Sequence, residues 1–229
     1  GMHDLFHWTH EEAVIIDYVL RVKQPYLNVG FFVIRAVIYF AVWALLAVLL
    51  WRVSRQQDAQ HNPPQIARMR RISAPGLILF AVTITFAAFD WFMSLDPHWF
   101  STIFGVYVFS GALLAIVAFI TLLTLILRSH GVLKGVITSE HDHDLGKLLF
   151  AFIIFWGYMA FSQYFLIWYG NIPEETLWML HRWEGSWRIV TLILVFGHFV
   201  IPFFVLFPQE IKRNKAVLAT MSLWILVVH

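Results

Sequence analysis

The stretch "GFFVIRAVIYFAVWALLAVLLWR", residues 30–52, decides the fold of this chain. It is uninterrupted apolar sequence except for one internal charge, Arg35, until Arg52 is reached. The hydrocarbon core of a bilayer is about 30 Å thick and a helix rises about 1.5 Å per residue, so roughly 20 such residues cross it. We therefore expect residues 30–52 to form a transmembrane helix.

Similar apolar runs recur along the chain and predict an all-α fold, a polytopic bundle of transmembrane helices. Of the 229 residues, 60% are hydrophobic and only 13% are charged, whereas about a quarter of the residues of a soluble domain are charged. We expect residues 1–29 to form a segment on the outer side of the membrane, and Pro75 to lie in the first turn of its span. The predicted spans are residues 30–52, 75–95, 103–127, 148–169, 187–207 and, truncated, 216–229.

Two global features exclude whole classes of function. The chain has no cysteine, which rules out a disulfide, cysteine ligation of an iron–sulfur cluster and a thiolate nucleophile within it. Its net charge is only +2, and its basic residues lie in separate loops rather than in a tract that could follow a nucleic acid backbone. We therefore expect contact with the lipid bilayer and none with nucleic acid.

The basic residues alternate between loops, which predicts the orientation of the spans. Lys and Arg concentrate on the cytoplasmic side of membrane proteins. Residues 52–71 carry five Arg, residues 128–147 carry three basic residues including Lys134, and residues 208–215 carry three, whereas residues 96–102 carry none. The segments that we expect on the outer side are therefore 1–29, 96–102 and 170–186.

Arg35 and Asp90 are formal charges inside predicted spans. Each lies five residues from the outer end of its span, so antiparallel helices would hold both at a depth of about 8 Å. Charges inside a membrane are costly, and they commonly pair with one another or line a polar path. The sequence predicts an Arg35–Asp90 ion pair between the first two spans. In the alternative reading Arg35 reaches outward to the surface and Asp90 caps its helix.

The gap "DPHW", residues 96–99, combines a chain reversal with an available histidine. Asp followed by Pro favours a turn, and a tryptophan at this level anchors the chain in the membrane interface. This structural role accounts for Asp96, Pro97 and Trp99. It leaves His98 as a candidate functional residue on the outer side.

Glu184, Thr191 and His198 are spaced by seven residues along the fifth span. Seven residues are nearly two turns of an α-helix, so the three side chains would share one face. Because a histidine exchanges protons near neutral pH, this stripe resembles part of a proton path. A lone histidine hydrogen-bonded within the bundle is the structural alternative. A bis-histidine haem would need a second mid-membrane histidine, which no other complete span supplies.

The run "SEHDHDLGK", residues 139–147, precedes the fourth span on the expected inner side. Its His and Asp residues resemble metal ligands, but a solvated loop in which Asp144 caps the next helix explains them as well, and we expect no metal here. Tyr158 and Ser162, four residues apart, would continue a polar face into the membrane. We therefore interpret Asp144 and Lys147 as the entrance of a proton path.

Four stretches of the chain carry a resemblance to a known family: "GMHDLFHWTHEEAV", "YLNVGFFVIRAVIYFAVW", "FDWFMSLDPHWFSTIFGVYVFSG" and "HDLGKLLFAFIIFWGYMAFSQYFLIWYGNIPEE". They resemble the second polysulfide-reductase-like (NrfD-like) membrane subunit of alternative complex III, a family of quinol:cytochrome c oxidoreductases. Members of the family are longer and arrange their spans largely as four-helix bundles, so the resemblance implies that architecture and a sequence that is part of a longer protein.

The resemblance implies a multi-pass subunit of the bacterial cytoplasmic membrane that supports menaquinol oxidation by the whole assembly and proton translocation. It implies no redox cofactor bound by this chain, with menaquinol as a candidate ligand and with haem c and iron–sulfur clusters in partner subunits. The implied partners are a sister NrfD-like membrane subunit, an iron–sulfur protein, multihaem cytochrome c subunits and a terminal oxidase. The candidates for quinol binding are His3, Asp4 and His98; those for a proton path are Asp144, Lys147, Tyr158, Ser162, His198, Thr191, Glu184, Asp90 and Arg35.

Two other classes of function stay open. A secondary transporter would have polar groups at mid-membrane on helices interrupted by Gly or Pro, and a structural membrane anchor would tolerate Arg35, Asp90 and His198 without using them. Copurification with haem and iron–sulfur partners distinguishes the respiratory subunit from both.

Overall fold

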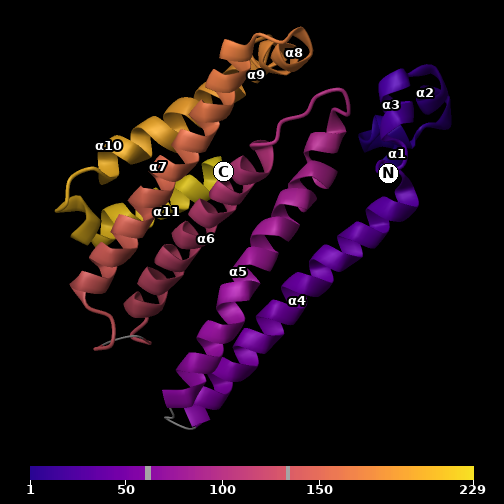
Figure 1. Cartoon of the computed structure of the whole chain (residues 1–229). Coiled ribbons are helices and arrows are strands. Elements are labelled where there is room, and N and C mark those ends of the chain that lie inside the picture. Colours follow the sequence, from indigo (N-terminus) through magenta and orange to yellow (C-terminus); the bar gives the residue numbers. More distant parts are fainter. Residues whose placement is uncertain (60–62, 133–134) are drawn as a thin grey trace. The chain divides into compact units, whose positions relative to one another are not determined.

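The computed structural model of the chain describes residues 1–59, 63–132 and 135–229, and Lys134 lies outside these ranges. Within them the chain forms helices and no strand, which confirms the predicted all-α fold (Figure 1). Among the described residues, five helical segments are long and apolar enough to cross a membrane, and each overlaps one of the five complete spans expected from the sequence. The protein is therefore a multi-pass membrane protein.

The helices belong to two compact units, Gly1–Gly105 and Val106–His229. The first unit includes residues 1–29, the segment that we expected on the outer side of the membrane. Its elements are α1 (Met2–Leu5), η1 (His7–Thr9), α2 (Glu11–Ile16), α3 (Tyr18–Lys23), α4 (Val29–Ala59), α5 (Pro63–Trp91) and η2 (Met93–Leu95). The second unit contains α6 (Phe104–Ser129, from Val106), α7 (Ser139–Gly170), α8 (Pro173–His181), α9 (Trp187–Leu192), η3 (Ile193–Val200), α10 (Ile201–Leu206), η4 (Ile211–Arg213) and α11 (Lys215–Val228).

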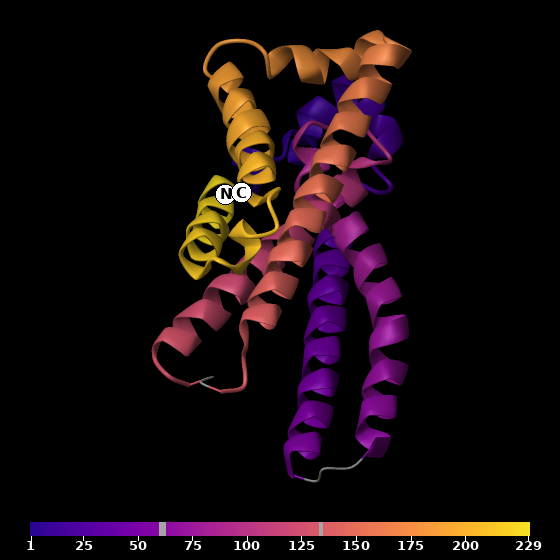
Figure 2. The same cartoon turned by 90° about the vertical axis from the view of Figure 1, so that its left-hand side faces the viewer.

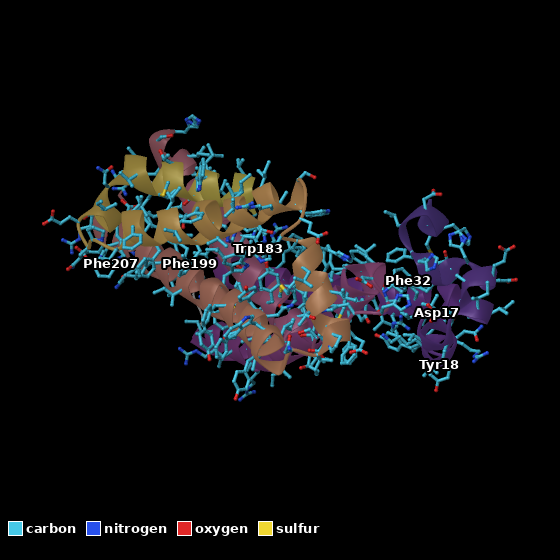
Figure 3. All side chains as sticks on the ribbon, turned by 90° about the horizontal axis from the view of Figure 1, so that it is seen from above. Asp17, Tyr18, Phe32, Trp183, Phe199 and Phe207 are labelled. Atoms are coloured by element: carbon cyan, nitrogen blue, oxygen red, sulfur yellow. The ribbon has the colours of Figure 1, made fainter. Side chains whose placement is uncertain are left out.

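In the first unit, α4 and α5 form a long hairpin and lie side by side in two perpendicular views (Figures 1 and 2). The short N-terminal helices pack at one end of it around a small aromatic cluster. The ring of Phe32 on α4 lies 5.4 Å from that of Phe6 and 5.5 Å from that of Trp8, between centroids, and Leu20 is buried beside them. Such distances are typical of favourable aromatic pairs. The labels of Phe32 and Asp17 mark this end of the unit in Figure 3.

The hairpin helices extend beyond the spans expected from hydropathy. The second span was expected from residue 75, but α5 begins at Pro63, so Pro75 lies inside the helix and not in its first turn. The reason is that Gln, Arg, Met and Ala between these positions favour a helix although they are not apolar enough for a membrane. The 29 residues of α5 measure about 44 Å along the axis, more than a bilayer core requires.

The second unit is built around one apolar core. Buried side chains from α6, α7, α10 and α11 meet there, and the fully buried ones include Leu114, Ile153, Leu206 and Ile225. On α11 the buried residues Leu218, Met221, Ser222 and Ile225 recur at helical spacing. This core positions the face of α11 that also carries His229.

The fifth span is not a continuous α-helix. Residues Ile193–Val200 form a π-helix, in which each N–H bonds the carbonyl five residues earlier, as Ile201 does with Phe196. In this ladder the carbonyl of Gly197 would need an N–H at position 202, and Pro202 has none. The indole Nε1 of Trp224 on α11 donates to that carbonyl at 2.8 Å. A tertiary hydrogen bond thus satisfies the group that the proline leaves open.

Candidate functional site

A buried ion pair joins the two helices of the first unit. Arg35 on α4 donates from Nε to Asp90 Oδ2 at 2.8 Å and from Nη2 to Asp90 Oδ1 at 2.9 Å. Tyr39, one turn further along α4, donates its hydroxyl to Asp90 Oδ2 at 2.8 Å. Asp90 is fully buried and Arg35 is 6% exposed. The ion pair predicted from the sequence is confirmed, and Asp90 does not serve as a free helix cap.

Arg35 is also enclosed by the N-terminal segment. Its guanidinium carbon lies 3.9 Å from the ring centroid of Tyr26 and 4.2 Å from that of Phe31, and its Nη1 donates to the carbonyl of Tyr26 at 3.0 Å. Burial, reinforced by the negative charge of Asp90, raises the pKa of Tyr26 to about 12. Tyr26 therefore stays neutral at physiological pH, and the arginine keeps both its counter-ion and a cation–π partner.

His98 is paired rather than free. Its Nε2 lies 2.5 Å from Asp17 Oδ2, and this hydrogen bond is the main reason that the pKa of Asp17 falls below its ordinary value of 3.8. The other oxygen of Asp17 accepts from the backbone of Val19 at 2.8 Å and caps α3. One carboxylate thus fixes a helix start and the turn after α5 at the same time.

Two further contacts tie the N-terminal segment to the same turn. Trp8 Nε1 donates to the carbonyl of Ser94 at 3.1 Å, and Lys23 Nζ donates to the carbonyl of Pro97 at 2.5 Å. Burial lowers the pKa of Lys23, while the charge of Asp96 opposes this shift. Together with the Asp17 contact, these bonds join residues 1–28 to the turn after α5 at three points.

His3 and Asp4 lie on the exposed side of the N-terminal segment. Thr9 Oγ1 donates to the carbonyl of Phe6 at 2.7 Å and accepts from His3 Nδ1 at 2.9 Å, so the neutral His3 ring has its open acceptor at Nε2. His10 Nε2 donates to the carbonyl of His3 at 2.9 Å, which leaves His10 Nδ1 as an acceptor. The carboxylate of Asp4 contacts the amino group of Gly1. The segment therefore presents two histidine nitrogens as open hydrogen-bond acceptors.

In the second unit His198 is fully buried and bonded to another histidine. Its Nε2 lies 3.0 Å from Nδ1 of His229 at the end of α11, and its ring packs edge-on against Trp156 of α7 at 4.1 Å between centroids. Among the buried polar atoms that the structure describes, His198 Nδ1 has no hydrogen-bond partner. The interpretation of His198 as a lone histidine is therefore wrong.

The stripe expected from Glu184 through Thr191 to His198 does not form. Glu184 is exposed and lies before α9, which begins at Trp187. Thr191 is partly buried and donates to the carbonyl of Arg182 at 2.8 Å. Between Thr191 and His198 the backbone enters the wider π-helix, in which seven residues no longer make two turns. Equal spacing in sequence therefore does not become a shared face.

At the start of α7 the buried acid is Asp142, two residues before the sequence candidate Asp144. Asp144 is exposed and bonds Lys147 Nζ at 2.7 Å, and Thr138 rather than Asp144 is the N-cap. Asp142 is fully buried and accepts from Arg128 Nη1 of α6 at 2.6 Å through Oδ2. Its Oδ1 has no partner in the described part of the chain. The buried charge at this end of the unit is therefore an Arg–Asp pair.

Tyr158 and Ser162 lie away from the buried face of α7. Tyr158 is 61% exposed and Ser162 is partly buried. The buried face instead follows a spacing of seven residues, and Gln163 on it has an unpartnered Nε2 among the described buried atoms. The residues of this stripe are Asp142, Leu149, Trp156 and Gln163.

The described residues hold no group of three or more His, Cys, Asp or Glu side chains arranged to bind a metal ion. The residues brought together instead are two histidines in the second unit and an Arg–Asp–Tyr cluster in the first. Two of them were not singled out from the sequence: Tyr39 and His229. Tyr39 follows Arg35 by four residues, so helical spacing was the signal that could have found it.

No protein-family model matches this sequence, and no curated protein matches it at a significant level.

Proposed function

We propose that the chain is an integral membrane subunit of a menaquinol:cytochrome c oxidoreductase of the alternative complex III type, in the bacterial cytoplasmic membrane. One observation carries the proposal beyond the sequence resemblance. Two of the stretches that carry this resemblance, residues 1–14 and the first-unit part of the third stretch, residues 89–105, fold against each other, with Trp8 donating to the carbonyl of Ser94. Neighbouring residues add the Asp17–His98 and Lys23–Pro97 bonds. The resembling segments thus form one local structure.

The chemistry of this structure is compatible with quinol oxidation. Oxidising a quinol releases two protons and two electrons, so its site needs acceptors for protons within hydrogen-bond reach of the quinol hydroxyl. His3 Nε2 and His10 Nδ1 are exposed acceptors whose tautomers are set by hydrogen bonds on the other ring nitrogen. His98 and Asp4 are the other candidates for contact. We assign the electron carriers, haem c and iron–sulfur clusters, to partner subunits.

The proposed partners are the sister membrane subunit, an iron–sulfur protein, multihaem cytochromes and a terminal oxidase. The proposal includes a role for the buried polar groups in moving protons. The groups are Arg35 and Asp90 in the first unit and His198 in the second, with Asp144, Lys147, Tyr158, Ser162, Thr191 and Glu184 as the further sequence candidates.

The test is purification from native membranes in mild detergent, followed by redox difference spectroscopy and peptide identification of whatever accompanies the chain. We expect haem c absorbance and an iron–sulfur protein in the same particle, together with menaquinol-dependent reduction of cytochrome c. His3→Gln should lower that activity while haem content stays constant, and exposed His130→Gln is the matched control. A colourless chain that purifies alone rejects the proposal and favours a transporter or an anchor.

A further inference from the structure

Several features set the contact between the buried His198 and His229 in the second unit apart from ordinary packing. The rings of His198 and His229 lie 5.1 Å apart between centroids and 30° from parallel, with Nε2 and Nδ1 at hydrogen-bond distance. Trp156 packs against His198 on another side. His198 is fully buried. Burying a polar group without a hydrogen-bond partner costs free energy, so the unpartnered His198 Nδ1 needs an explanation.

The backbone around His198 is also unusual. It lies in the eight-residue π-helix Ile193–Val200. Such segments are rare and occur frequently at functional sites. The carbonyl of Gly197, next to His198, is bonded by Trp224 and not by the helix ladder. The ring is therefore carried on a helix segment whose hydrogen bonds are shared with α11, the helix that precedes His229.

The hydrogen-bond chemistry of two imidazoles leads to a specific proton count. A neutral imidazole has one N–H and one acceptor nitrogen, so one proton occupies the space between His198 Nε2 and His229 Nδ1. If His198 Nε2 donates it, His198 Nδ1 is an acceptor with no partner among the described residues and His229 Nε2 carries the next hydrogen. If His229 donates it, the opposite tautomers hold. The pair therefore has two tautomeric states, which differ only in the nitrogens that carry the hydrogens.

We propose that His198 and His229 form a proton-exchanging pair inside the second unit. A proton that reaches the buried His198 Nδ1 binds there, the Nε2 proton of His198 passes to His229 Nδ1, and the Nε2 proton of His229 leaves to water. One proton enters and one leaves, and both rings end neutral in their other tautomers. The inference names the proton-carrying atoms of the proposed function and rests on that proposal only for the use to which the proton is put.

The groups around the pair suit this exchange. No charged partner is bonded to His198, and its hydrogen-bond partner is His229 alone in the described part of the chain. Trp156 in turn packs against Tyr107 of α6, with 5.7 Å between the ring centroids. The Arg128–Asp142 pair lies at the start of α7, four turns from Trp156. A permanent ion pair would hold one protonation state, and among the described residues no ion pair is bonded to either ring.

A substitution at Gly111 on α6 displaces the ring of His229 without changing either histidine. A Cβ built on Gly111 would lie 2.6 Å from His229 Cε1 and 3.3 Å from its Nε2. Real Cβ atoms do not approach other atoms at 2.6 Å, so Gly111→Ala must displace the imidazole. Gly170→Ala is the matched control, because a Cβ there meets no atom within 4 Å.

The experiment is ¹⁵N NMR of the full chain, labelled at histidine and held in lipid nanodiscs. We expect a scalar coupling across the hydrogen bond between His198 Nε2 and His229 Nδ1, and exchange-averaged ¹⁵N shifts for all four nitrogens. His229→Phe and Gly111→Ala should each abolish the coupling and leave His198 in one fixed tautomer. Gly170→Ala should leave both signals unchanged.

Two results would overturn the inference. Absence of the coupling in the unaltered chain removes the pair, and a coupling with fixed tautomers makes it a structural hydrogen bond. Neither result depends on quinol chemistry. If the pair exchanges protons but the chain purifies alone, the proposed function is rejected and the pair is kept. If the tautomers are fixed but the particle oxidises quinol, the pair is rejected and the proposed function is kept.

Discussion

The guanidinium of Arg35 and the carboxylate of Asp90 form a two-point ion pair with N–O distances of 2.8 and 2.9 Å. The two residues are 55 positions apart in the sequence and lie on different helices. Neither side chain reaches solvent to any useful extent, and Tyr39 and the carbonyl of Tyr26 complete the hydrogen bonds. The pair joins α4, α5 and the N-terminal segment. Its removal should therefore affect the whole first unit.

Asp90→Ala should destabilise the protein by about 3–5 kcal/mol, because it leaves a buried guanidinium without its counter-ion. The double variant Arg35→Leu with Asp90→Leu should recover most of that loss, since a buried pair often contributes little over apolar side chains of similar volume. Equilibrium unfolding in mixed micelles measures both. Equal losses in the single and double variants would contradict this account of the pair.

Tyr39→Phe should cost about 2 kcal/mol, the range for a buried hydrogen bond to a charged group. The same measurement on Tyr158→Phe is the control, because that tyrosine is 61% exposed. We expect its loss to stay within about 0.5 kcal/mol. A loss as large for Tyr158 as for Tyr39 would show that the hydroxyl bond to Asp90 is not the cause.

The attachment of the N-terminal segment should weaken in acid. The His98 bond lowers the pKa of Asp17 in the folded state below 3.8, so the folded carboxylate binds its proton less readily than the unfolded one. The stabilisation is therefore complete above the unfolded pKa and is lost as the pH falls through the folded pKa. Lys23 and Asp96 are the other charged residues near this turn. Burial lowers the pKa of Lys23, and the charge of Asp96 opposes that shift.

A spin label on Ala13→Cys, the only cysteine of that variant, measures the attachment. Its mobility should be low at neutral pH and rise as the pH falls below 3.8. Asp17→Asn is the matched control, because asparagine still caps α3 but cannot ionise. We expect it to show a smaller pH response, and an identical midpoint in both proteins would assign the transition to another group.

Arg128→Ala should destabilise the second unit by about 3 kcal/mol at neutral pH, since it strands the fully buried carboxylate of Asp142. Arg213→Ala is the control: it removes a pair with Glu140 at 3.2 Å whose side chains are about half exposed, and such pairs contribute less than about 1 kcal/mol. Chemical unfolding compares the two. Similar losses would mean that burial does not distinguish these ion pairs.

Depth in the membrane explains why one part of the candidate site was predictable. Arg35 and Asp90 stand out because apolar sequence surrounds them, and each lies five residues from the end of its span. Two charges at one depth on adjacent antiparallel helices have few partners except each other. The pair was therefore predicted from position alone.

The contrast between Asp142 and Asp144 shows where such reasoning ends. Both follow Thr138 within two turns of the same helix, and neighbours in sequence give no reason to prefer either. Asp142 is on the buried stripe and Asp144 points outward with Lys147. That choice depends on which face of α7 packs against α6, which no local pattern specifies.

The sequence by itself determined the number and approximate limits of the membrane spans and the all-α class, because a continuous apolar run of sufficient length can only be satisfied in lipid as a helix. Only the tertiary structure decided which polar side chains meet. The His198–His229 pair joins residues 31 positions apart, and it depends on a π-helix stabilised by Trp224, on Pro202 and on the space left by Gly111. These features depend on contacts between helices, which the periodicity of a single helix does not predict.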